Sequence, residues 1–143
     1  MTISTASATW AGGLKTGKGE FTASSGAFQG AYSFSTRFEG ARGTNPEELL
    51  ATAFAACLSM ALAAGLEKEG HAPTRISTTA SVSMEKVAEG FRITRMMLDV
   101  RGQVPGIDQA AFAAAAEGAK NGCPVSQVFK GNIELKLEAR LES

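Results

Sequence analysis

The chain has 143 residues, which is enough for one domain to bury a core without disulfide or metal staples. Hydrophobic residues make up 44% and charged residues 20%, as in ordinary soluble globular proteins. Lys and Arg number 14, as do Asp and Glu, so the formal net charge is zero. This balance argues against nucleic-acid binding and against a surface for anionic lipid. We therefore expect a single domain over residues 1–143 that binds neither nucleic acid nor membrane.

Two stretches bear on where the protein resides. The first ten residues lack the basic start and apolar core of a signal peptide, so we expect a cytoplasmic protein. The longest apolar run, residues 49–66, is mostly alanine and is interrupted by Thr52, Ser59 and Gly65. That composition favours a buried soluble helix over a membrane span. In the cytoplasm two cysteines seldom form a permanent disulfide.

Glycine-rich turns divide the first third of the chain into short strands. We expect these strands at residues 7–12, 18–24 and 29–35. A helix should start at "GTNPEELL", where Asn45 can cap it and Pro46 suits its first position. The two glutamates that follow favour the positive end of the helix dipole.

This helix should run to about Lys68 and end at Gly70. Apolar residues surround nearly every face of it between residues 49 and 66. A helix that is apolar all round is buried all round. One sheet covers only one side, so something else must cover the other.

The hydrophobic period then changes to two. Residues 75–85 alternate cleanly, a turn at Glu89 and Gly90 follows, and residues 91–100 change register near Arg95, which suggests a bulge. A second helix is expected from Asp108 to about Lys120, and "NIELKLEARLE" at residues 132–142 reads as a last strand. The order predicts an α+β domain with antiparallel sheets packed around a long central helix.

Few residues could support chemistry other than that of thiols. Cys57, Cys123 and the single histidine, His71, could in principle form a Cys2His zinc site, but His71 directly after a helix end is better explained by the helix dipole. Neither a nucleophile elbow nor a nucleotide-binding glycine motif is present. We therefore expect no metal and no cofactor.

The two cysteines differ in their local setting. In "NGCPVSQVF", Cys123 would cap a short helix that begins at Pro124, a position that favours the thiolate. Cys57 lies in the middle of the long helix, far from either dipole end and from any charge within two turns. The local sequence therefore predicts that Cys123 is the more acidic thiol, and that any cation near Cys57 comes from elsewhere in the fold.

Three motifs carry a family resemblance. "TRFEG", "GTNPEELLATAFAACLSMAL" and "NGCPVSQVF", in this order and at these intervals, resemble the OsmC/Ohr family of osmotically inducible and organic hydroperoxide resistance proteins, and its OsmC branch in particular. The resemblance implies that Cys57 is the peroxidatic cysteine and Cys123 the resolving one. It implies that Arg37 stabilises the thiolate and the peroxide, and that Glu47 orients Arg37. The implied fold is an intertwined homodimer with the two long helices at its centre.

The implied activity is that of a thiol-dependent peroxidase, which reduces organic hydroperoxides through a sulfenic acid and a Cys57–Cys123 disulfide. The implied reductant is a dithiol, such as a lipoylated protein. An apolar pocket near the cysteines, with Phe54, Met60 and Phe129 as suggested lining, would favour alkyl over hydrogen peroxide. Two alternatives remain open: a non-catalytic redox sensor that uses the same disulfide, and a small-ligand binding module with inert cysteines.

Helix geometry adds an inference about the dimer. Glu47 and Cys57 are ten residues apart, roughly 15 Å along a helix and about 80° around it. They are therefore poorly placed to share one arginine within a chain. If two copies of the helix cross near Thr52, each active site would combine Cys57 and Cys123 of one chain with Arg37 and Glu47 of its partner. Without the family resemblance, Arg37 could instead be a surface cation paired with Glu39.

Overall fold

The computed structural model describes residues 1–142 and contains two compact units. The N-terminal unit, Met1–Leu49, holds an antiparallel sheet in the order β1-β2-β3 and the short helix α1. Its elements are β1 (Ala6–Ala11), β2 (Lys18–Ala23), β3 (Gln29–Tyr32) and α1 (Phe34–Phe38). The three predicted strands are confirmed: the bounds of the first two agree to within one residue, and the third ends three residues earlier than expected.

Residues 33–35 were expected in that third strand but begin α1 instead. Ser33 caps the helix: its hydroxyl accepts from the Thr36 amide at 3.2 Å, and the Ser33 amide donates to Thr36 Oγ1 at 2.9 Å. This reciprocal capping box satisfies two amides that a helix start otherwise leaves unpaired. The helix matters for the site because it carries Arg37 in its last turn.

The long helix α2 (Pro46–Lys68) has the predicted bounds. Asn45 Oδ1 accepts from the Glu48 amide at 2.8 Å, which confirms the predicted cap. At the other end Gly70 has a φ of +88°, and the amides of Gly70 and His71 donate to the carbonyls of Glu67 and Leu66 at 2.9 and 2.8 Å. A left-handed glycine with this bond pair terminates the helix.

Within a single chain α2 buries one face only. Phe54, Leu58, Leu62 and Leu66, spaced four residues apart, are all at most 1% exposed. The opposite face is exposed and consists mainly of small residues together with Met60, which is 76% exposed. The expectation of burial all round is therefore wrong for the single chain, because its own sheet and helices reach one face. By length and composition α2 is the one helix within residues 1–142 that could cross a membrane, but its buried face belongs to the core described below.

The C-terminal unit begins at Leu50 and contains a second sheet in the order β4-β5-β6. Strands β4 (Arg75–Val87) and β5 (Gly90–Gln103) form an antiparallel hairpin. Ser83 pairs with Arg95 and Met84 with Ile93, so Thr94 is the extra residue of a bulge. The bulge predicted near Arg95 is thus confirmed.

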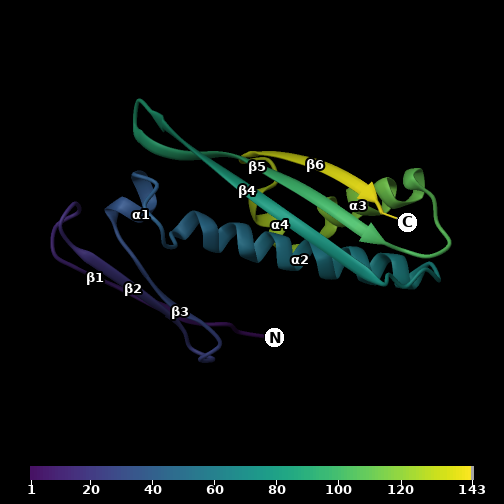
Figure 1. The fold of residues 1–143 in the computed structure, drawn as a ribbon, viewed down its shortest axis with the longest axis horizontal. Helices are drawn as coiled ribbons and strands as arrows, with labels where there is room; N and C mark the ends of the chain where they lie inside the picture. Colours follow the sequence, from purple (N-terminus) through teal and green to yellow (C-terminus); the bar gives the residue numbers. More distant parts are fainter. Residues whose placement is uncertain (143) are drawn as a thin grey trace. The chain divides into compact units, whose positions relative to one another are not determined.

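The last strand corrects the prediction of wholly antiparallel sheets. Strand β6 (Glu134–Leu141) pairs with β5 in parallel, and the two ribbons run the same way in Figure 1. The chain between them forms α3 (Gln109–Gly122) and α4 (Pro124–Phe129). This long crossover returns the chain to the starting end of β5, so β6 runs in the same direction as β5. The α+β class is confirmed.

Helices and sheet of the C-terminal unit enclose one apolar core. Met96, Leu98 and Val100 of β5 are fully buried in one cluster with the buried face of α2 and with Phe112 of α3. Gly102 allows this close packing, because a Cβ there would lie 2.4 Å from Phe112 Cε1. The alternating apolar positions of β6 pack against the same core, as its sequence pattern predicts.

Candidate active site

The first part of the candidate site is an ion pair in the N-terminal unit. Arg37 Nη2 donates to Glu47 Oε1 at 2.7 Å, and Arg37 Nε lies 3.1 and 3.3 Å from the two carboxylate oxygens. Two neighbouring nitrogens of the guanidinium thus face one carboxylate, the geometry in which arginine is held in a defined plane. The Glu47 side chain is 10% exposed and that of Arg37 is 37% exposed.

Backbone and ring contacts set the position of this pair. Arg37 belongs to α1 and Glu47 to the first turn of α2. Asn45 joins the two helices, because its Nδ2 donates to the Thr36 carbonyl at 3.3 Å while its Oδ1 caps α2. The Arg37 guanidinium carbon also lies 5.2 Å from the centre of the Phe38 ring.

The guanidinium keeps one nitrogen for another acceptor. Among residues 1–142 the structure shows no hydrogen-bond acceptor for Arg37 Nη1. Glu39, the alternative partner that the sequence allowed, accepts instead from Ser35 Oγ at 3.1 Å. An arginine fixed by one carboxylate and partly open to solvent can still bind an anion or a polar oxygen.

The second part of the candidate site is a pair of free thiols in the C-terminal unit. Cys57 lies on α2 and is partly buried, whereas Cys123, between α3 and α4, is 1% exposed. The Cys57 side chain lies near enough to raise the pKa of Cys123; Cys123 belongs to the apolar core cluster and Cys57 packs against it. The fold therefore brings together two cysteines that are 66 positions apart (123 − 57) in the sequence.

Cys123 occupies the capping position that the sequence predicted. It follows α3 and precedes Pro124, the first residue of α4, and its Sγ accepts from the Ser126 amide at 3.3 Å. Its predicted acidity is wrong, however. Burial raises the pKa of the Cys123 thiol, and the hydrogen bond and charge of nearby Cys57 raise it further. The amides of Ser126 and Val125 each lower this pKa by less than burial raises it.

Two of the three residues suggested as an apolar lining lie in or against the core that contains Cys123. The rings of Phe54 and Phe129 stack with centroids 5.9 Å apart and planes inclined by 11°. Phe54 is fully buried and Phe129 packs against this core. Met60 instead lies on the exposed face of α2.

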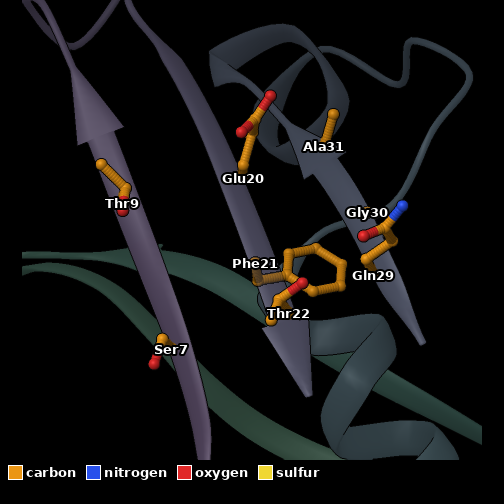
Figure 2. A pocket seen from close by; sticks show the side chains of 8 residues that line it. All are labelled: Ser7, Thr9, Glu20, Phe21, Thr22, Gln29, Gly30 and Ala31. Carbon is orange, nitrogen blue, oxygen red and sulfur yellow. The ribbon is translucent and has the colours of Figure 1, made fainter. Parts of the chain in front are cut away.

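A separate hollow of about 540 Å³ lies on the β1-β2-β3 sheet, and Figure 2 shows the side chains around it. It is lined by hydroxyls, one carboxylate, one carboxamide, one aromatic ring and two small residues: Ser7, Thr9, Glu20, Phe21, Thr22, Gln29, Gly30 and Ala31. This lining offers neither a thiol nor a cation. The hollow is therefore a poorer candidate for chemistry than the ion pair or the thiol pair.

Comparison with known proteins shows the family to which this chain belongs. The model of the OsmC-like protein family matches residues 39–138 of the chain. The chain belongs to the OsmC family. Peroxiredoxin OsmC of Escherichia coli (strain K12) is 50% identical over 132 residues, 92% of each chain. The organic hydroperoxide resistance protein of Xanthomonas axonopodis pv. citri (strain 306) is 34% identical over 99 residues, 68% of each chain.

Solved structures agree with this family assignment. The crystal structure of the organic hydroperoxide resistance protein OhrB of Bacillus subtilis superposes with a TM-score of 0.76 at 28% identity, and the match covers 95% of this chain and 98% of that one. The resemblance inferred from the three sequence motifs is therefore confirmed. The higher identity to the OsmC relative agrees with the OsmC branch.

Two contributors to the candidate site were missed in the sequence. Asn45 was expected only as a helix cap, and Ser126 was not singled out at all. Ser126 is fully buried, and its hydroxyl and amide both bond within the α3–α4 junction. The sequence feature that could have identified Ser126 is its place three residues after Cys123, in the first turn of a short helix that Cys123 caps.

Proposed function

We propose that this chain is a thiol-dependent peroxidase that reduces organic hydroperoxides to alcohols. Membership of the OsmC family and the names of its relatives, peroxiredoxin OsmC and organic hydroperoxide resistance protein, support a peroxidase role. The observation that carries the cysteine mechanism is the proximity of two free thiols, Cys123 in the apolar core and Cys57 packed against it, near enough for Cys57 to raise the pKa of Cys123. Two free thiols in contact can form a disulfide after oxidation of one of them.

Cys57 is the peroxidatic residue in this proposal, because it is the less buried of the two thiols. Its thiolate attacks one peroxide oxygen, the O–O bond breaks, and the alkoxide takes a proton and leaves as alcohol. Cys57 is then a sulfenic acid. The Cys123 thiolate attacks this sulfur, the S–O bond breaks, and hydroxide leaves as water after it takes a proton. A dithiol reduces the resulting disulfide by two exchange steps and is itself oxidised to a disulfide.

Arg37 and Glu47 provide the positive charge in this scheme. Arg37 cannot lose its proton, so its guanidinium favours the anionic sulfur and can donate to a peroxide oxygen. Arg37 donates to Glu47 through Nε and Nη2, so its Nη1 remains available to donate to the peroxide oxygen. Glu47 thus acts by orienting Arg37 and need not touch the substrate.

We infer that the active site is shared within a homodimer, with Cys57 and Cys123 from one chain and Arg37 and Glu47 from the other. Two features of α2 support this. Glu47 lies in its first turn and Cys57 near its middle, and its exposed face carries small residues that allow a second helix to approach closely. The exposed small residues are Ala53, Ala56, Ala64 and Gly65.

Mixed dimers test the shared site directly. Cys57→Ser and Arg37→Ala chains are each expected to be inactive, but a dimer of one with the other regains one complete site. Random assembly makes about half of the dimers mixed, each with one complete site of two, so roughly a quarter of wild-type activity should return. Absence of recovery in co-expressed, purified mixed dimers would place the arginine and the cysteine of each site on one chain. A folded and fully active monomer would also contradict the proposal.

The proposed substrate is an organic rather than an inorganic peroxide, because the two thiols and the stacked phenylalanine rings belong to or pack against one apolar core. The proposed reductant is a small or protein-bound dithiol, and the proposed location is the cytoplasm. The decisive assay compares consumption of cumene hydroperoxide and hydrogen peroxide by the wild-type protein with excess dithiol. We expect many turnovers per chain and faster consumption of the organic peroxide.

Other outcomes of this assay would contradict the proposal. Oxidation of one equivalent without turnover would identify a redox sensor. Retention of both thiols after addition of peroxide would identify a binding module.

A further inference from the structure

Ser126 is the only polar side chain within residues 1–142 that is fully buried beside the thiol pair. Its hydroxyl donates to the carbonyl of Lys120, in the last turn of α3. Its backbone amide donates to Cys123 Sγ at 3.3 Å. One residue therefore bonds both to the helix before Cys123 and to the Cys123 sulfur itself.

The local structure explains why these two hydrogen bonds of Ser126 matter together. Helix α4 has only six residues, too few to be stable without external support. Its first residue is Pro124, which has no amide proton, so the amides nearest the sulfur are those of Val125 and Ser126. The direction of the Ser126 amide depends on how the first turn of α4 sits against α3. The buried hydroxyl bond to Lys120 fixes that turn.

We propose that Ser126 is a positioning residue for the resolving cysteine: its hydroxyl anchors the first turn of α4 so that the amide of the same residue holds the Cys123 sulfur beside Cys57. This inference rests on the proposed peroxidase function and on Cys123 as the resolving residue. Ser126 itself touches neither peroxide nor dithiol in this scheme.

The step that needs this arrangement is disulfide formation. Cys123 must lose its proton and attack the sulfur of the Cys57 sulfenic acid, with hydroxide as the leaving group, which is then protonated to water. Burial opposes the charged form by raising the pKa of Cys123, whereas the Ser126 amide lowers that pKa. Without the bond from the Ser126 hydroxyl to the Lys120 carbonyl, the Cys123 sulfur is oriented less precisely. The hydrogen bond from the Ser126 amide, which favours the Cys123 thiolate, is also weakened. The first step, attack of Cys57 on peroxide, does not use this bond.

The test compares Ser126→Ala with Gln127→Ala in the full-length protein. Gln127 is a matched control, because its side chain also bonds across the same junction, to the Asn121 carbonyl, but it is exposed and its contact does not reach Cys123. Reduced protein is mixed with tert-butyl hydroperoxide without dithiol. Hydroperoxide loss reports the first step, and mass spectrometry after quenching separates sulfenic acid from disulfide.

We expect Ser126→Ala to oxidise Cys57 at the wild-type rate but to form the disulfide about tenfold more slowly, as the loss of one hydrogen bond implies. The sulfenic acid then accumulates. The disulfide step should also shift to higher pH, which a purely structural role would not produce. Gln127→Ala should match wild type in both steps. Folded protein is first isolated by gel filtration, and the rate of disulfide formation is counted per oxidised Cys57, so that unfolded chains do not contribute to it.

The role of Ser126 would be overturned if Ser126→Ala formed the disulfide at the wild-type rate, or if Gln127→Ala slowed disulfide formation equally. It would also be overturned if Ser126→Ala slowed the oxidation of Cys57 as much as disulfide formation, or did not oxidise Cys57 at all. These outcomes differ from failure of the proposed function itself. If wild-type protein forms no Cys57–Cys123 disulfide with the hydroperoxide, the peroxidase mechanism fails, and the inference about Ser126 fails with it.

Discussion

The ion pair of the N-terminal unit and the thiol pair of the C-terminal unit are held in opposite ways. Side-chain hydrogen bonds position Arg37 against Glu47, and the arginine stays 37% exposed. Core packing and a backbone amide position Cys123 against Cys57, and Cys123 is 1% exposed. Arg37 stays near water, where its desolvation costs little, and the buried Glu47 carboxylate is paired with it, whereas Cys123 is buried in the apolar core.

This difference indicates which kind of substitution should disturb the ion pair and which should disturb the thiol pair. The ion pair depends on a few directed bonds, so conservative substitutions should disturb it. The thiol pair depends on burial, which also raises the pKa of Cys123. The predictions below compare the effects of changing the ion pair with the effects of changing the thiol pair.

The largest effect should come from the thiols themselves. Cys57→Ser should abolish hydroperoxide consumption, because serine forms no sulfenic acid. Cys123→Ser should allow one turnover per chain and then stop, because no disulfide can form for the dithiol to reduce. Single-turnover and steady-state assays on both variants measure this. Equal loss of the first turnover in the two variants would reverse or cancel the assigned roles.

Next in size are substitutions in the ion pair. Arg37→Lys removes the planar fork but keeps the charge, and Glu47→Gln removes the charge that holds the fork. We expect the value of kcat/KM to fall between about tenfold and a hundredfold in each, as is usual for residues that support a reacting group. Arg101→Lys is the control, because Arg101 is similarly exposed and pairs with Asp99 at 3.3 Å on the other unit. A similar fall in that control would show a general charge effect.

A smaller effect is expected from the residue that joins α1 to α2. Asn45→Ala removes the α2 cap and the bond to Thr36, and should lower the free energy of unfolding by about 1 kcal/mol. It should also lower the peroxidase rate, but less than Glu47→Gln does. Asp108→Ala is the matched control, since Asp108 caps α3 by accepting from the Ala111 amide at 2.8 Å. That control should lose similar stability and keep its rate.

The smallest effect is a pH dependence of stability. Because the pKa of Cys123 is raised in the folded chain, its contribution is complete below the usual pKa of a thiol and is lost as pH rises through the raised value. Denaturant unfolding of reduced protein should therefore show a loss of stability in alkaline solution. Cys123→Ala should lose less over the same range. Identical slopes for the two proteins would mean that other groups cause the loss.

The sequence predicted what depends on local pattern. The bounds of α2, the cap at Asn45, the bulge near Arg95 and the cap at Cys123 all follow from residue types at fixed spacing. The direction of β6 did not, because alternating residues mark a strand and its faces but not the sense in which it pairs. The acidity of Cys123 failed for a similar reason: the helix start is visible in the sequence, but burial depends on the whole core.

The site was predicted through the family resemblance more than through local pattern. Nothing in the spacing of Arg37 and Glu47 shows that they meet, since their contact depends on a short helix whose first residues were expected to end a strand. The motifs pointed to these residues nonetheless. Ser126 escaped notice because a hydroxyl becomes informative only once its burial and its partners are known.

The parallel pairing of β6 has a consequence for how the chain folds. The β4–β5 hairpin pairs strands that are adjacent in the sequence. The pairing of β5 with β6 instead joins Arg95 to Glu134, which lies almost forty residues later in the chain (134 − 95 = 39). Contacts that close such long loops form slowly and late. We expect pulsed hydrogen exchange during refolding to protect the hairpin amides first and those of β6 last. The nascent protein would then expose one edge of its core until almost the whole chain has left the ribosome.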